Sequence, residues 1–201
     1  IKNIYLPMIG FHNVLNALAA ISVSLQLKIS DKKIKDGLTN FTGVNRRFSK
    51  VGVFNGITVF DDYGHHPVEI KAVLDAAKNA SPRNVIAVIQ PHRYSRLSLL
   101  FDEFCKCFES ADHVIVSKVY SAGESPIINC DRDSLVSALI EGGNKKAIPL
   151  GSPEELPGII HNLARDGDWV ICLGAGDITS WANALPNNLE KIASSNLQGS
   201  A

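Results

Sequence analysis

The 201-residue sequence has 45% hydrophobic and 20% charged residues, a composition typical of soluble globular proteins that argues against a disordered or membrane-embedded chain. Its 20 basic residues balance 20 acidic residues without a block of like charge, so nothing indicates binding to nucleic acid or to an anionic membrane. The length allows one domain of about 100 to 150 residues and a smaller appendage.

Neither membrane insertion nor export is expected. The longest apolar run, at 14–27, is interrupted by Asn16 and is too short to span a bilayer. Residues 1–10 show no basic region followed by an apolar stretch, so no signal peptide is expected, although the chain does not begin with Met. The four cysteines form no CxxC pair, which favours reduced thiols and predicts a cytoplasmic protein without a metal site.

The first 40 residues predict two helices. Apolar residues recur at helical spacing over 11–27, and a second short helix is expected at 31–38. Two lone helices cannot bury a core by themselves, and the sequence supplies no earlier partner for them. We therefore interpret residues 1–42 as the last helices of a preceding domain.

A new domain is expected to begin with a hairpin. Residues 51–60 form two β-prone runs around Asn55 and Gly56, a pair typical of a hairpin turn. Helices and strands then alternate. The helices are expected at 67–80, 97–110, 131–141, 153–165 and from about 178, and the strands at 85–90, 114–119, 146–150 and 169–173. Because residues 186–201 become polar and aperiodic, we expect a frayed terminus, with 191–201 as its tail.

The strands at 85–90 and 169–173 are continuous apolar runs, as is typical of buried parallel strands. The sequence therefore predicts an α/β domain at 43–190, with a Rossmann-like, mainly parallel sheet and helices on both faces. In such sheets ligands bind beyond the carboxyl ends of the strands. Polar segments follow these ends at 61–67, 90–96, 118–124 and 174–177.

The first polar segment holds two carboxylates and two imidazoles within 61–66. A carboxylate there could accept hydrogen bonds from ribose hydroxyls, and the imidazoles could orient a second substrate. Alternatively, Asp62 only ends the strand and Pro67 opens the next helix. The density of ionisable groups favours a functional site.

The second segment places Arg93 and Arg96 three residues apart after a strand. Planar guanidinium groups suit two-point recognition of a carboxylate. The alternative is a solvated cap for the helix that follows. A further basic pair, Arg46 and Arg47, could reach a phosphate or simply face solvent.

Two other motifs are weaker. His12 and Asn16 share a helical face, and Asn13 shares an edge with Asn16, so the amides could hydrogen-bond an adenine, although Asn13 could equally be a helix cap. The glycines at 174–176 follow the last strand and lack the third glycine of the dinucleotide fingerprint. An oxidoreductase that uses a nicotinamide cofactor would rest on these glycines and on the αβ alternation alone.

Six segments, taken in order, resemble the Mur ligase family, and within it the MurC branch, over nearly the whole chain. They are GFHNVLNA (10–17), GVNRRF (43–48), FDDYGHHP (60–67), QPHRYSR (90–96), VYSAGESPI (119–127) and LGAGDI (173–178). Gly64 and Arg93 favour this branch over the related murein-peptide ligases, which tend to have DDFAHHP and lack PHRYSR.

The resemblance implies a three-domain, ATP-dependent enzyme of peptidoglycan precursor synthesis. Such an enzyme joins L-alanine to UDP-N-acetylmuramate through an acyl phosphate. Residues 1–42 would be the end of its central ATPase domain, and only the third domain would be complete. The phosphate-binding GxxxxGK[ST] loop is absent from the 201 residues, so the Mg2+ ligands are expected in the central domain and the chain alone is expected to be inactive.

The resemblance also implies residue roles. His12, Asn13, Asn16, Arg47 and Asp62 would bind ATP, and Tyr63, His65, Arg93 and Arg96 would line the L-alanine pocket. No residue of the chain is assigned to catalysis, and the expected partners are the small-molecule substrates alone. The alternatives are a stand-alone module that binds a nucleotide or an amino acid, and a related Mur ligase such as a murein-peptide ligase.

Overall fold

The computed structural model describes residues 1–80, 83–143 and 146–198, and its contacts divide the chain into two units, Ile1–Asn45 and Arg46–Ala201. The first unit contains helices α1 (Phe11–Gln26) and α2 (Asp31–Thr39), close to the two helices expected. Helix α1 leaves Phe11 75% exposed and Leu18 52% exposed. That these residues end an ATPase domain stays a prediction.

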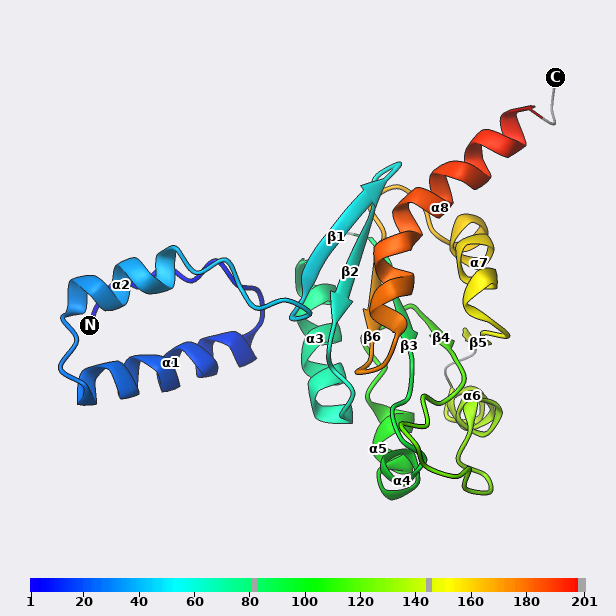
Figure 1. Ribbon diagram of the computed structural model, residues 1–201, viewed down its shortest axis with the longest axis horizontal. Helices are drawn as coiled ribbons and strands as arrows, with labels where there is room; N and C mark the ends of the chain where they lie inside the picture. Colours follow the sequence, from blue (N-terminus) through cyan, green and yellow to red (C-terminus); the bar gives the residue numbers. More distant parts are fainter. Residues whose placement is uncertain (81–82, 144–145, 199–201) are drawn as a thin grey trace. The chain divides into compact units, whose positions relative to one another are not determined.

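The described part of the second unit forms a six-stranded sheet in the order β1-β2-β6-β3-β4-β5 (Figure 1). Strand β1 runs antiparallel to β2, and the other neighbouring pairs are parallel, which confirms the mainly parallel sheet. The strands are β1 (Ser49–Phe54), β2 (Ile57–Asp62), β3 (Val85–Ile89), β4 (His113–Val116), β5 (Ala147–Pro149) and β6 (Trp169–Leu173).

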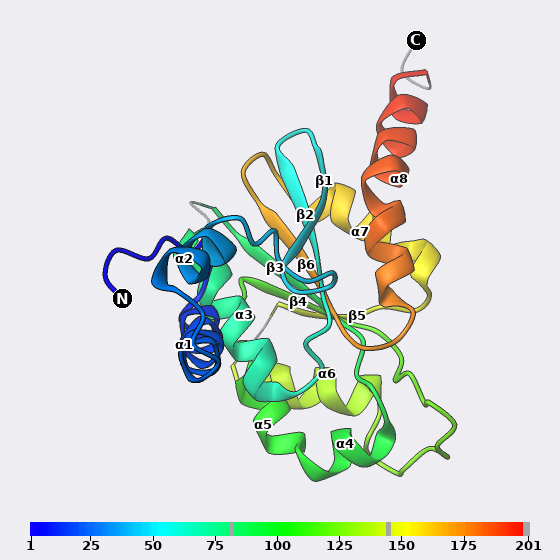
Figure 2. The same cartoon turned by 60° about the vertical axis from the view of Figure 1, so that its left-hand side comes forward.

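Helices cover both faces of this sheet, as the sequence predicted (Figure 2). One face packs against α3 (Pro67–Ala80), α4 (Tyr94–Leu99), α5 (Phe101–Lys106) and α6 (Arg132–Glu141), and the other against α7 (Leu156–Leu163) and α8 (Ile178–Gln198). Successive strand residues point to opposite faces, so Ala87 joins the first core while Ile86 and Val88 join the second.

Two expectations need correction. The helix expected at 97–110 is split into α4 and α5, because Leu100 leaves the helical conformation with φ −119° and ψ 28°. The frayed terminus expected from residue 186, including the tail at 191–201, is wrong as far as Gln198, because α8 continues to that residue. Helix α8 buries Leu185 and Leu189 against the sheet, and this apolar stripe outweighs the polar composition. Residues 199–201 lie outside the described residues.

The chain order places a switch point between β3 and β6. From β3 the chain continues outward through β4 to β5, and it then returns through the short 3₁₀ helix η1 (Pro153–Glu155) and α7 to β6, between β2 and β3. Such a reversal is the usual ligand site of an open α/β sheet. Gly174 follows β6 with φ 153°, and a Cβ atom there would lie 2.9 Å from the carbonyl oxygen of Gln90.

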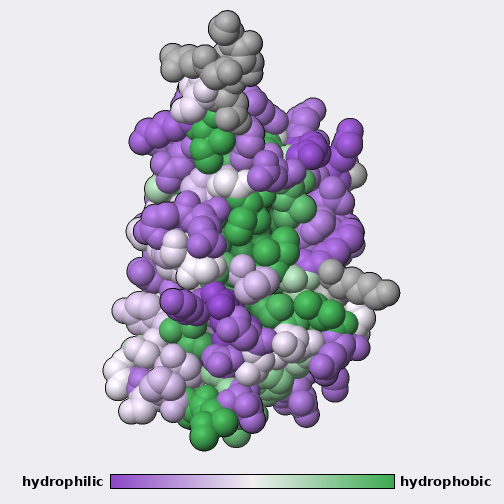
Figure 3. Space-filling model, turned by 90° about the vertical axis from the view of Figure 1, so that its right-hand side faces the viewer, coloured by the Kyte–Doolittle hydropathy of each residue, from purple (hydrophilic) through white to green (hydrophobic). Residues whose placement is uncertain are grey.

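None of the described helices combines the length and the apolarity that a bilayer crossing demands. On the face toward α6 and α7, apolar surface is bordered by hydrophilic side chains (Figure 3). Ile140 is exposed on α6, and exposed apolar residues of this kind are common on soluble proteins.

Replacing Gly56 by alanine should lower the free energy of unfolding by about 1 to 3 kcal/mol. Gly56 follows Asn55 in the turn between β1 and β2 and has φ 76°, and an added Cβ would overlap the Asp166 carboxylate. Gly123→Ala is the matched control, because Gly123 has φ 87° but nothing within 4 Å of an added Cβ. Urea unfolding gives the loss of stability of each variant, and the difference between them measures the overlap with Asp166. Equal losses would show that Asp166 does not contribute to the effect of Gly56→Ala.

Candidate functional site

The loops that follow β2, β3, β4 and β6 lie at one edge of the sheet. The backbone N–H of Gly174 donates to the carbonyl of Asp62 at 3.1 Å, which joins the loops after β6 and β2. The N–H of Arg93 donates to the carbonyl of Tyr120 at 2.8 Å, which joins the loops after β3 and β4. The structure therefore brings together the polar segments that the sequence separates.

Four rings from these loops form a continuous row. The Tyr63 and His65 rings meet edge to face with centroids 5.2 Å apart, and the His65 and His92 centroids are 5.8 Å apart. His92 then stacks on Tyr120, with centroids 5.4 Å apart and planes inclined by 13°. The sequence placed Tyr63 and His65 in one site, but the long separation from Tyr120 hid the last member of the row.

Hydrogen bonds orient the two imidazoles differently. The Nδ1 atom of His65 lies 2.9 Å from the carbonyl oxygen of Tyr63, so this nitrogen carries a hydrogen, and in neutral His65 the Nε2 atom is left as an acceptor. The Nδ1 atom of His92 lies 3.2 Å from a guanidinium nitrogen of Arg96, a donor, so in neutral His92 the hydrogen is on Nε2. Burial, and next the positive charge of Arg96, lower the pKa of His92.

Arg93 and Arg96 do not share a carboxylate in this structure. Arg96 donates to the carbonyl of His92 at 2.8 Å, whereas Arg93 lies 3.4 Å from Glu124. Glu124 also accepts hydrogen bonds from the N–H of Ser95 at 2.9 Å and its hydroxyl at 2.7 Å. The Ser95 hydrogen bonds, chiefly from the N–H, lower the pKa of Glu124. Sequence reasoning assigned no role to this carboxylate, and its spacing from Arg93 gives no signal.

Arg47 stands beside the same row of rings. Its guanidinium lies 3.5 Å from Glu69 and 6.0 Å from the centroid of the Tyr63 ring. The Arg47 side chain is 47% exposed, so the ion pair is weak and the cation is accessible to a ligand.

Asp62 is buried, and its carboxylate accepts hydrogen bonds from the backbone. Its Oδ1 accepts the N–H of Gly64 at 2.6 Å, and its Oδ2 accepts the N–H of Phe48 at 2.7 Å. The residue is only 1% exposed, and burial raises the pKa of its carboxyl group despite these hydrogen bonds. Of the predicted ATP ligands, Asp62 has the least accessible side chain.

The neighbouring acid, Asp61, faces α8. Its Oδ2 accepts the Thr179 hydroxyl at 2.6 Å and lies 3.6 Å from Nε of Arg46. Arg46 also donates to the carbonyl of Gly174 at 2.7 Å, and its guanidinium lies 4.7 Å from the Tyr63 ring centroid. The sequence offered Arg46 to a phosphate and a carboxylate of this segment to a ribose, but it did not predict that Arg46 and Asp61 pair with each other. Strand alternation could have shown that Asp61 and Asp62 point to opposite faces.

The remaining predicted residues, His12, Asn13 and Asn16, belong to the first unit. Gly10 occupies the N-cap of α1, so the alternative in which Asn13 is that cap is wrong. Asn13 is buried and its side-chain amide donates to the carbonyl of Ile9 at 2.7 Å. His12 is half-buried and Asn16 is exposed. Their ligand roles stay predictions.

The second unit is thus an α/β domain whose polar groups gather beyond the carboxyl ends of its strands, where open α/β sheets usually bind their ligands. A family model described as "Mur ligase, glutamate ligase domain" matches residues 46–176. The chain belongs to the Mur ligase family.

Curated relatives support the same family over nearly the whole chain. The chain is 59% identical over 192 residues to UDP-N-acetylmuramate–L-alanine ligase of Xanthobacter autotrophicus, a match that covers 96% of the chain and 41% of the relative. It is 58% identical to the enzyme of the same name from Gluconobacter oxydans, over 93% of the chain and 39% of that relative. The chain therefore spans about two fifths of these relatives.

Solved structures agree with the fold. The UDP-N-acetylmuramate–alanine ligase MurC of Thermotoga maritima matches with a TM-score of 0.76 and 31% identity, over 96% of the chain and 40% of that structure. A murein peptide ligase of Psychrobacter arcticus has a TM-score of 0.65 and 26% identity, over 92% and 38%. A MurF ligase of Thermotoga maritima, solved with ADP, is 18% identical and shows the fold alone.

Proposed function

We propose that this chain is part of an ATP-dependent ligase that joins L-alanine to UDP-N-acetylmuramate in peptidoglycan precursor synthesis. The observation that carries the proposal is the 59% identity, over 96% of the chain, to an enzyme named for this reaction. The lower identity to a murein peptide ligase, 26%, makes that related activity the weaker alternative. Because the chain covers 41% of the relative's length, the activity would belong to a longer protein.

Tyr63, His65, Arg93 and Arg96 would line the L-alanine pocket, with the guanidinium groups on its carboxylate. The Arg93 side chain is 49% exposed and its only described ion pair is with Glu124 at 3.4 Å. Solvent and salt screen exposed pairs of this kind, so they contribute little to stability. A substrate carboxylate can therefore compete with Glu124 for Arg93.

The imidazoles of His65 and His92 would contact different groups, the amine of L-alanine and an oxygen of the substrate. The amine must lose its proton before it attacks an acyl phosphate, and the free Nε2 of His65 can accept a hydrogen bond from it. Neutral His92 presents an N–H at Nε2, which can donate to an oxygen of the substrate. Holding the amine close to its target can supply roughly 7 to 11 kcal/mol in favourable cases.

His12, Asn13, Asn16 and Arg47 would contact ATP, and Arg47 has the accessible charge that a phosphate needs. Asp62 would maintain the backbone here rather than meet the ribose directly. Within 1–80, 83–143 and 146–198, no group of three or more His, Cys, Asp or Glu residues lies close enough to hold a metal ion. The Mg2+ ligands would belong to the central domain, as the resemblance to the family implies.

The purified 201-residue chain should release no phosphate from ATP when L-alanine and UDP-N-acetylmuramate are added. It contains no GxxxxGK[ST] loop to hold the phosphates. A coupled phosphate assay checks this, with a full-length ligase of a relative as the positive control. Alanine-dependent release by the chain itself would contradict the proposal that it is only part of the enzyme.

A stand-alone binding module is the second candidate, and it predicts tight, saturable binding of ATP or L-alanine by the chain alone. The incomplete ligase predicts weak binding of each. Calorimetry with the two ligands separates these functions.

A further inference from the structure

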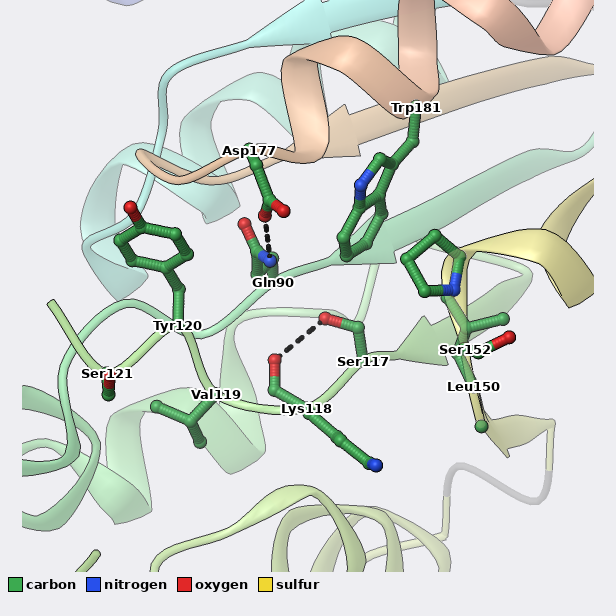
Figure 4. Close-up of a pocket in the computed structure, with 12 residues that line it drawn as sticks. Gln90, Ser117, Lys118, Val119, Tyr120, Ser121, Leu150, Ser152, Asp177 and Trp181 are labelled. Atoms are coloured by element: carbon green, nitrogen blue, oxygen red, sulfur yellow. Dashed lines mark hydrogen bonds between the residues drawn. The ribbon is translucent and has the colours of Figure 1, made fainter. Parts of the chain in front are cut away.

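A pocket that none of the proposed ATP or L-alanine residues lines opens beside the switch point. It has a volume of about 280 Å³ and lies among the loops that follow β3, β4, β5 and β6 (Figure 4). Its principal side chains are Gln90, Ser117, Lys118, Tyr120, Asp177 and Trp181. Ligand pockets are roughly 300 to 1,000 Å³, so this pocket suits a small ligand.

Two aromatic residues stand on opposite sides of the pocket. Figure 4 shows Tyr120 and Trp181 apart, with Asp177 and Gln90 between them. Tyr120 is held by its stacking on His92. A Cβ atom on Gly176 would lie 2.7 Å from the Tyr120 ring, so only glycine lets the loop after β6 pass this close to the ring.

The polar groups of the pocket divide into occupied and available ones. The Gln90 amide is engaged at both ends, because its nitrogen donates to Asp177 at 2.7 Å and its oxygen accepts the N–H of Ile178 at 3.3 Å. Asp177 has no ion pair with any described residue, and Lys118 likewise has none. In the described part of the chain the indole N–H of Trp181 also has no acceptor.

These groups together limit the class of ligand. An organic cation would suit the two rings and Asp177 but would be repelled by Lys118. An aromatic acid would suit the rings and Lys118, but its carboxylate would be repelled by Asp177. A mononucleotide uses all of them, because its base stacks on aromatic rings, its ribose hydroxyls donate to a carboxylate and its phosphate binds an ammonium group.

We propose that the pocket between Tyr120 and Trp181 is a binding site for a nucleoside monophosphate. The base lies against Trp181, the ribose hydroxyls donate to Asp177 and the phosphate meets Lys118. Because Tyr120 stacks on His92, an occupied pocket would also steady the row of rings. The proposal goes beyond the ligase function and does not rest on it.

Tryptophan fluorescence of the full 201-residue chain tests this site directly. The chain has two tryptophans, and Trp169 packs against Phe60 with ring centroids 4.7 Å apart. Trp169→Phe therefore leaves Trp181 as the reporter. We expect AMP to change its emission saturably, and adenosine to do so more weakly because it lacks the phosphate.

Further substitutions in the Trp169→Phe chain show which residues of the pocket bind AMP. Lys118→Ala should weaken the binding of AMP about five- to tenfold and leave the binding of adenosine unchanged. Asp177→Asn should weaken the binding of both ligands equally. Lys191→Ala, an exposed lysine farther along α8, is the matched control and should change neither. Circular dichroism checks each fold, and if Trp169→Phe does not fold, calorimetry of AMP with the natural chain and its Lys118→Ala variant replaces fluorescence.

The absence of saturable AMP binding would overturn the proposal. So would binding that falls with Asn16→Ala but not with Lys118→Ala, because it would assign the nucleotide to the proposed ATP residues. The Lys118 and Asp177 results decide the pocket whatever the phosphate assay of the ligase gives.

Discussion

Replacing Arg93 by alanine should raise the KM for L-alanine about 10- to 100-fold in the full-length enzyme that the proposed function requires, with the KM for ATP little changed. A charge-assisted hydrogen bond to a carboxylate is worth about 1.5 to 3 kcal/mol, and Arg93 is the exposed guanidinium of the pair at the end of β3. Initial rates measured against each substrate check the result.

Arg93→Lys is the matched variant, because it keeps the charge but loses the planar donors. It should restore part of the affinity for L-alanine, which a purely structural role of Arg93 would not predict. Equal losses for L-alanine and ATP in Arg93→Ala would contradict the assignment.

Replacing Asp62 by asparagine should lower the free energy of unfolding by about 2 kcal/mol. Both carboxylate oxygens accept backbone N–H groups, from Gly64 and Phe48, whereas asparagine offers one acceptor and one donor. One buried N–H would then face another donor. Urea unfolding measures the loss, and Asp133→Asn, an exposed acid paired with Arg132 at 2.7 Å, is the control with an expected loss of about 1 kcal/mol or less.

The difference in the free energy of unfolding between the wild type and Asp62→Asn should also depend on pH. Burial holds the pKa of folded Asp62 above its ordinary value of 3.8, so the folded state binds this proton more tightly than the unfolded chain. The contribution of this proton to stability is present below pH 3.8 and is lost as the pH rises through the folded pKa. The wild type should therefore lose stability relative to Asp62→Asn across that window, and a gain would contradict the raised pKa.

Local patterns in the sequence were enough to predict the type of fold. The apolar run that became β3 predicted a buried parallel strand, and Asn55 with Gly56 predicted the β1–β2 turn. The break at Leu100 could not be predicted in this way, because neither neighbouring helix carries a proline or glycine there. The helical end of the chain was missed because burial of Leu189 depends on the sheet beneath it.

The candidate site was predictable only where its residues are close in sequence. Tyr63 and His65 belong to one motif, and their loop is where strand β2 ends. The partners that decide what each group can do come from elsewhere: Glu124 for Arg93, Tyr120 for His92 and Thr179 for Asp61. The pocket at Trp181 was missed for the same reason, since four separate loops build it.

The central position of β6 also constrains how this domain can form. Strands β2 and β3 have no hydrogen bonds to each other, because β6, the last strand among the described residues, lies between them. Arg46 likewise reaches its acceptor at Gly174 across 128 positions. Contacts between such distant positions form slowly, since the chain must close a long loop first. During synthesis, the polar edge at the carboxyl ends of the strands therefore cannot assemble until β6 has left the ribosome.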